Sequence, residues 1–348
     1  MSTVLTNIGE LVTLAGDKVL GDNGEGQTSW LLNGLNWVLQ NKATYNIRVV
    51  NLSLGSTAID SYRNDPVCVK VKELASAGIV VVAAAGNLGK SNTGQGIYGR
   101  IHSPGNSPYA ITVGASNTYG TVTRADDTMT TYSSRGPTRG FFTTSEGYRV
   151  YDNLMKPDLV APGNKLISYK SANNLLVSHN PALALDATND ADSMMYMSGT
   201  SMAAPVVSGA AALLLQVNPN LTPGMIKMLL QYTARPVAGA NTLEQGAGEL
   251  NMDGAVRLAR SLRTDVDFET AANGSSIMPS GSTMPETSST VGEDTFTWAQ
   301  MVTGNHTTIN GANLATQFQT VYKRANTFGS GVTFSNGRVV FFRYLTPP

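Results

Sequence analysis

Residues 197–205 read MSGTSMAAP and continue without a break into the apolar run VVSGAAALLL at 206–215. The run predicts a buried helix, and Ser201 lies at its start among small residues that let another backbone approach closely. A helix start presents free N–H groups and the positive end of the helix dipole to an anion. Two interpretations fit: a serine that caps a core helix, and a serine nucleophile whose tetrahedral adduct carries a negative oxygen.

The motif around Ser201 separates two classes of serine hydrolase. Residues 199–205 read G-T-S-M-A-x-P, and this pattern resembles the serine motif of the subtilisin-like serine peptidases. The G-x-S-x-G elbow of the α/β-hydrolases needs a second glycine, whereas position 203 holds alanine. The motif therefore favours a subtilase over an esterase.

Composition limits the classes of partner. The chain has 348 residues, of which 41% are hydrophobic, enough for a sizeable core. Its 24 basic and 24 acidic residues balance and no basic cluster occurs, so we expect neither nucleic acid nor an anionic membrane as partner. The single cysteine, Cys68, is expected to pack as a small hydrophobe. No apolar run reaches membrane-spanning length, and residues 1–16 do not read as a signal peptide.

Helices and buried strands alternate along the first half of the chain. The pattern predicts a helix from Thr28 or Ser29 to about Asn41, a strand over 48–55, a helix over 66–77, a strand over 79–85 and a strand over 110–114. This alternation predicts an α/β fold with a parallel sheet covered on both faces, whose site lies beyond the carboxyl ends of the strands. Asn87 follows one strand end, where it is either a turn residue or a carboxamide donor near Ser201.

Further blocks extend the resemblance to the subtilases over residues 18–263. They occur in subtilase order at 18–20, 51–55, 83–87, 132–137 and 156–163. The resemblance implies a three-layer subtilisin-like fold with a mostly parallel sheet. It also implies a serine endopeptidase that hydrolyses peptide bonds through an acyl-enzyme on Ser201.

The resemblance also implies which residues form the site. Ser201 would be the nucleophile and Asn87 the side chain of the oxyanion hole. The segment Ser53, Leu54 and Gly55 would pair with an extended peptide, as peptides add to exposed sheet edges elsewhere. Ala84, Ala85 and Gly86 would line the pocket for the residue before the scissile bond, and their small size leaves room for a large apolar side chain.

The sequence departs from the family at the other two members of the triad. Subtilases carry Asp, His and Ser in that order, and the D-[ST]-G and H-G-T-H blocks would precede residue 18, where neither occurs. The histidines, expected in surface loops, are His102, His179 and His306. The aspartates considered, and interpreted as loop or cap residues, are Asp17, Asp22 and Asp158. We therefore expect an N-terminally incomplete subtilase, inactive as this isolated chain, or alternatively a non-catalytic remnant that binds extended peptides.

The domain boundaries follow from these patterns. We expect a partial peptidase domain over 1–264, a flexible linker rich in Ser, Thr, Gly and Pro over 265–295, and a tail with short strands over 296–348. The aspartates at 186, 190 and 192 do not match an EF-hand, so no cofactor is expected, and calcium is suggested by the family alone. The resemblance implies a polypeptide substrate, secretion, and a monomer once the chain is completed.

Overall fold

The computed structural model describes residues 26–304, apart from 172, 186–192, 269 and 271–276, and three short strands beyond them. Those strands are β15 (Thr307–Asn310), β16 (Asn326–Thr327) and β17 (Thr333–Phe334). The expectations for 18–20, Asp17, Asp22, His306 and the aspartates at 186–192 lie outside the described residues.

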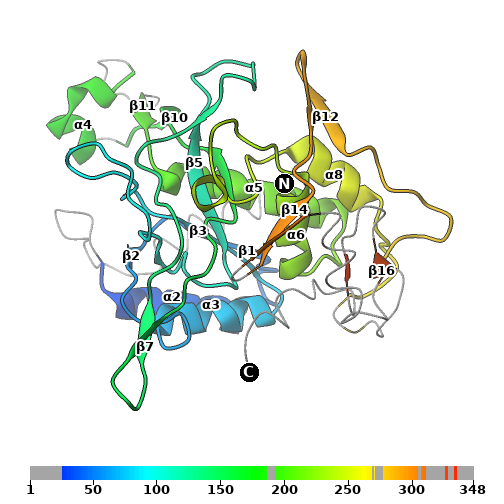
Figure 1. The fold of residues 1–348 in the computed structure, drawn as a ribbon, viewed down its shortest axis with the longest axis horizontal. Coiled ribbons are helices and arrows are strands. Elements are labelled where there is room, and N and C mark those ends of the chain that lie inside the picture. Colours follow the sequence, from blue (N-terminus) through cyan, green and yellow to red (C-terminus); the bar gives the residue numbers. More distant parts are fainter. Residues whose placement is uncertain are drawn as a thin grey trace.

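A five-stranded sheet forms the centre of the molecule (Figure 1). Its parallel strands are β1 (Val49–Leu52), β3 (Val80–Ala84), β5 (Ile111–Asn117) and β9 (Leu159–Pro162), with β6 (Thr128–Met129) antiparallel to the end of β5. The strands predicted over 48–55, 79–85 and 110–114 are therefore confirmed. The observed β1 ends at Leu52, so residues 53–55 leave the sheet as irregular backbone.

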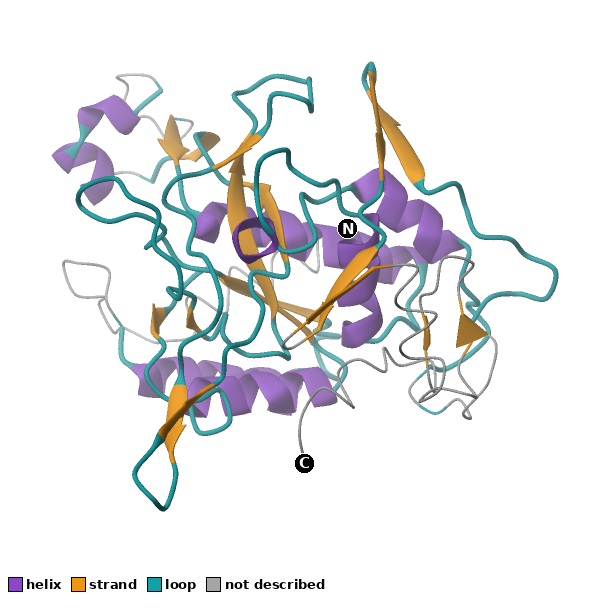
Figure 2. Cartoon of the chain, viewed as in Figure 1, coloured by secondary structure: helices purple, strands orange, loops and turns teal. Residues whose placement is uncertain are grey.

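Helices cover both faces of the sheet, which gives the predicted three layers (Figure 2). The helices α2 (Thr28–Asn41) and α3 (Pro66–Ser76) pack on one face against Val50, Val81 and Ala83. On the other face α5 (Thr200–Val217) and α6 (Pro223–Thr233) pack on the sheet, and α8 (Met252–Arg260) packs on these two helices. Their buried side chains form one core cluster with Val49 and Val82. Successive side chains of a strand point to opposite faces, so a continuous apolar run is required when both faces are buried.

Helix caps fix where the covering helices begin. Asp65 accepts hydrogen bonds from the N–H groups of Val67 and Cys68, with a proline at the first helical position. Thr222 caps α6 in the same way, accepting from the Met225 N–H, again with a proline at the first helical position. Cys68 is buried, as expected, and its thiol lies 3.1 Å from the Asn106 carboxamide oxygen.

The apolar character of α5 results from its place in the core. Of the helices among the described residues, α5 alone is long and apolar enough to cross a membrane. It packs against β1, β3, β5 and β9, and its side chains belong to the larger of the two main core clusters. Burial against the sheet therefore accounts for the buried half of the helix, whereas Val206 and Leu213 are 37% and 45% exposed.

The remaining elements are short and lie around the sheet. They are β2 (Ser56–Thr57), β4 (His102–Ser103), β7 (Phe141–Thr143), β8 (Arg149–Tyr151), β10 (Leu166–Tyr169), α4 (Leu175–His179), η1 (Pro181–Leu183), β11 (Met194–Met197) and α7 (Thr242–Gln245). The pairs β2 with β4, β7 with β8 and β10 with β11 are antiparallel. The last of these pairs leads directly into α5.

The segment expected to be a flexible linker instead packs on the core. Within 265–295 lie β12 (Ser288–Val291), the start of β13 (Asp294–Thr297) and Ile277, which is 2% exposed. The tail over 296–348, where short strands are expected, contains β14 (Met301–Gly304), and its Trp298 and Val302 are each 2% exposed. The N–H of Ala299 donates to the carbonyl of Ala234 at 2.7 Å, which ties the segment to the end of α6. The boundary at 264 is therefore corrected: residues 277–304 belong to the folded unit. Their few, widely spaced apolar side chains pack on the core formed by α5, α6 and α8.

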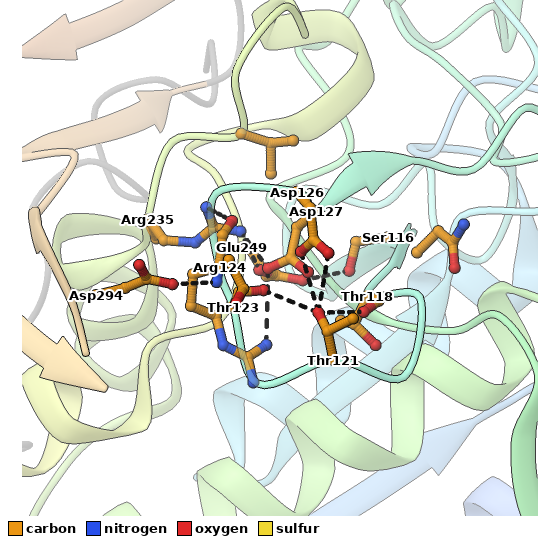
Figure 3. A network of polar contacts seen from close by, with 12 residues as sticks. Ser116, Thr118, Thr121, Thr123, Arg124, Asp126, Asp127, Arg235, Glu249 and Asp294 are labelled. Atoms are coloured by element: carbon orange, nitrogen blue, oxygen red, sulfur yellow. Dashed lines mark hydrogen bonds and ion pairs between the residues drawn. The ribbon is translucent and has the colours of Figure 1, made fainter. Parts of the chain in front are cut away.

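A polar network also holds this C-terminal segment (Figure 3). One guanidinium nitrogen of Arg235 donates to Asp127 and to Glu249, each at 2.6 Å. The neighbouring Arg124 N–H donates to the carboxylate of Asp294, on β13. Burial and the nearby Glu249 carboxylate raise the pKa of Asp127 to about 7. The network therefore joins the loop before β6, the start of the segment after α6, and the β12–β13 hairpin.

Candidate active site

Ser201 is the second residue of α5, and it follows directly from β11 through Gly199. A Cβ on Gly199 would lie 3.3 Å from the Asn87 amide nitrogen, so the absence of a side chain lets Asn87 approach closely. The Ser201 N–H has no hydrogen-bond partner among the described residues. The helix start thus offers a free donor beside the serine, as the first residues of a helix commonly do.

Asn87 is held against the start of α5 by the side chain and backbone of Thr200. The Asn87 carboxamide oxygen accepts a hydrogen bond from the Thr200 N–H at 2.9 Å and from the Thr200 hydroxyl at 3.1 Å. The Thr200 hydroxyl in turn accepts from the Gly86 N–H at 3.0 Å. Since its oxygen already has two donors, the Asn87 amide presents its NH₂ group as the remaining donor.

The structure therefore brings together the two residues that the sequence proposes for catalysis. Asn87 comes from the carboxyl end of β3, and Ser201 from the amino end of a helix more than a hundred residues later. Sequence reasoning missed Thr200, although it precedes the serine in the motif. Two donors, the Asn87 NH₂ group and the Ser201 N–H, are left at this point, and such a pair can stabilise a developing oxyanion.

The predicted peptide-binding segment lies beside the start of α5. Ser53 donates from its hydroxyl to the Ser201 carbonyl at 2.7 Å. Leu54 is 44% exposed, and in the described structure the backbone groups of 53–55 make no backbone hydrogen bonds. Gly55 lies so close to β4 that a Cβ there would come within 2.9 Å of the Ser103 carbonyl oxygen. The segment thus has free backbone groups of the kind that an added strand needs.

The residues proposed for the specificity pocket lie next to a partly buried histidine, His102. Ala84 and Ala85 are buried, and a Cβ on Gly86 would lie 2.7 Å from the His102 ring. The surface-loop expectation for His102 is therefore wrong, because pairing of β2 with β4 draws this residue under the backbone of 55 and 86. Its Nε2 is buried without a hydrogen-bond partner, and burial lowers the pKa of the imidazole.

The other candidate acid–base residues lie elsewhere. Asp158 is 1% exposed and forms ion pairs with Lys156 at 2.6 Å and Lys227 at 2.8 Å, so it is a buried charge partner rather than a loop or cap carboxylate. His179 is exposed at the end of α4. In the part of the chain that the structure describes, the Ser201 hydroxyl makes no hydrogen bond to a histidine or a carboxylate.

No metal centre is evident at the site. The described residues contain no group of three or more His, Cys, Asp or Glu side chains that could hold a metal ion. The calcium suggestion from the family resemblance stays a prediction.

Comparisons with known proteins match most of the chain to one family. Residues 4–255 match the subtilase family. Serine protease AprX of Bacillus subtilis is 37% identical over 253 residues, which are 70% of this chain and 51% of that relative. Subtilisin E of the same organism is 30% identical over 244 residues, 69% of this chain and 48% of that relative.

Among solved structures, the prenylagaramide maturation protease PagA superposes with a TM-score of 0.48 at 20% identity. The match covers 69% of this chain and 70% of that chain. The chain spans about half the length of AprX and of Subtilisin E.

Proposed function

The chain belongs to the subtilase family, and from this premise we propose that it carries the nucleophile and the oxyanion-binding half of a serine endopeptidase. Ser201 would attack the carbonyl carbon of a peptide bond, and the acyl-enzyme formed on its oxygen would then be hydrolysed. The substrate would be a polypeptide, and the protein would act outside the cell.

One observation carries this proposal: the Asn87 carboxamide is locked in a single orientation beside the serine. Thr200 occupies the Asn87 oxygen through two hydrogen bonds, so the NH₂ group and the Ser201 N–H remain as donors. Donors fixed before the reaction cost no reorganisation when negative charge develops on the substrate oxygen. A residue serving only as a turn needs no such arrangement.

The general base is the missing part of this mechanism. Abstraction of the Ser201 proton requires a base within hydrogen-bond reach, and the described residues place none there. We propose that a segment bearing the Asp and His blocks supplies it, and that the 348 residues alone hydrolyse peptides poorly. In subtilisin, loss of the triad serine or histidine lowers kcat by about 10⁶.

The alternative is a protein that binds extended peptides without cleaving them. The unpaired backbone of 53–55 favours this alternative, since it needs no base. The binding would resemble the addition of a strand to a sheet edge.

The test is hydrolysis of a peptide anilide, with labelling of Ser201 by a fluorophosphonate, in the chain alone and joined downstream of a subtilase segment that bears Asp and His. We expect turnover in the joined protein only, abolished by Ser201→Ala. Persistent inactivity of the joined protein, together with peptide binding measured by calorimetry, would favour the alternative.

A further inference from the structure

The proline of the serine motif leaves the nucleophile's own carbonyl without its helical partner. In an α-helix the carbonyl of one residue accepts from the N–H four positions later. For Ser201 that position is Pro205, which lies inside α5 and has no N–H. The Ser201 carbonyl therefore needs a donor from outside the helix.

Ser53 supplies that donor from the segment after β1. Its hydroxyl donates to the Ser201 carbonyl at 2.7 Å, and accepts in turn from the Asn51 amide at 2.8 Å. Because a hydroxyl has one proton, the bond from Asn51 leaves that proton directed at Ser201.

A third side chain fixes the orientation of Asn51. The Ser208 hydroxyl, buried two helical turns beyond Ser201, lies 3.0 Å from the Asn51 carboxamide oxygen and 3.1 Å from the Ala204 carbonyl. Its proton is shared between these two acceptors. The carboxamide of Asn51 is thus bound at its oxygen by Ser208 on α5 and at its nitrogen by Ser53.

We propose that Ser53 is a positioning residue for the nucleophile, and that Asn51 and Ser208 set its direction. The three side chains join the carboxyl end of β1 to the first turns of α5 by hydrogen bonds that replace the one removed by Pro205. The inference rests on the proposed function, in which residues 53–55 receive the peptide. The receiving backbone and the attacking oxygen are then held at one fixed separation, and the Ser53 hydroxyl is committed to Ser201 rather than to substrate.

The first test measures thermal unfolding of the chain as it stands. Ser53→Ala should lower the midpoint by about 3 °C, because a carbonyl near the core loses its donor. In a Pro205→Ala background the helix regains an N–H for that carbonyl, so Ser53→Ala should then lower the midpoint by less than about 1 °C. Ser56→Ala, at an exposed serine in β2, is the matched control. An equal loss in both backgrounds, or none in either, would overturn the assignment.

The second test separates positioning from substrate binding, in the chain joined to a segment with the Asp and His blocks. Ser53→Ala should lower kcat by about 10- to 100-fold and leave KM within about two-fold, since misplacement of a nucleophile acts on the transition state. Ser53→Thr keeps the hydroxyl and should restore kcat. A rise confined to KM would show that Ser53 only binds substrate. If the joined parent has no turnover, the proposed function fails. The comparison of melting midpoints with and without Pro205→Ala still decides the Ser53 assignment.

Discussion

Replacement of Thr200 by valine tests the organisation of the candidate site most directly. Valine keeps the shape of threonine but removes the hydroxyl, which is fully buried between Asn87 and Gly86. The Asn87 oxygen retains the Thr200 N–H, whereas the Gly86 N–H loses its partner. The substitution thus removes both hydrogen bonds of the Thr200 hydroxyl, and the loss of one of them leaves the buried Gly86 N–H unsatisfied.

The expected magnitude follows from these two losses. An unsatisfied buried donor costs about 1–3 kcal/mol, and a lost neutral hydrogen bond about 1 kcal/mol. Burial of the added methyl group offsets about 1 kcal/mol of this. We therefore expect the free energy of unfolding to fall by about 2 kcal/mol. With a urea slope near 3 kcal/mol per molar, the midpoint should move down by about 0.7 M.

The assay is urea unfolding followed by tryptophan fluorescence, with Thr57→Val, at an exposed position in β2, as the control. The slope of the unfolding free energy against urea concentration should stay unchanged in both variants. A shift in the Thr200 variant no larger than that of the control would refute the hydrogen-bond assignment, and with it the argument that the Asn87 amide has a fixed orientation.

Three further predictions concern the site, the polar network and the C-terminal segment. In the chain joined to the Asp and His blocks, Asn87→Leu should lower kcat by about 10²–10³ with little change in KM, as loss of one oxyanion donor does in subtilisin; an effect on KM alone would contradict this. Asp127, with its pKa raised to about 7, keeps a proton that the unfolded chain loses near pH 4, so stability should fall as pH rises between these values. Asp127→Asn should reduce the difference in melting midpoint between pH 4.5 and pH 8. An unchanged difference would count against this role of Asp127. Trp298→Ala should lower the free energy of unfolding by about 3–5 kcal/mol in urea unfolding, because Trp298 is 2% exposed, whereas a tail that did not pack on the core would lose almost nothing.

Local patterns in the sequence were sufficient for the layered architecture. Continuous runs of small and β-branched apolar residues predicted β1, β3 and β5, because a strand buried on both faces admits no polar alternation. The apolar spacing over 66–77 predicted α3, and a capping aspartate with the proline after it fixes where that helix begins. The motif at 199–205 identified the start of α5, and the glycine and asparagine after β3 identified the carboxyl end of that strand. These two ends meet at the candidate site.

The polar partners could be read only from the tertiary structure. Thr200 with Asn87, Ser53 with Ser201, and Asp158 with Lys227 are separated by 113, 148 and 69 positions, the last counted from the residue numbers. A side chain's own neighbours in sequence do not specify which distant donor will reach it. The same holds for His102, which strand pairing places beneath Gly86.

The sequence determined which residues are buried in the sheet and where helices begin, since both depend on neighbours within a few positions. The tertiary structure alone decided what covers the core at 277–304 and which hydrogen bonds orient the serine. A low density of apolar residues predicts a linker over 265–295, but Phe268 and Ile277 in that range are buried because the core cluster of α5, α6 and α8 offers a complementary surface. Burial free energy depends on that surface, and a surface assembled from distant segments exists only after the chain has folded.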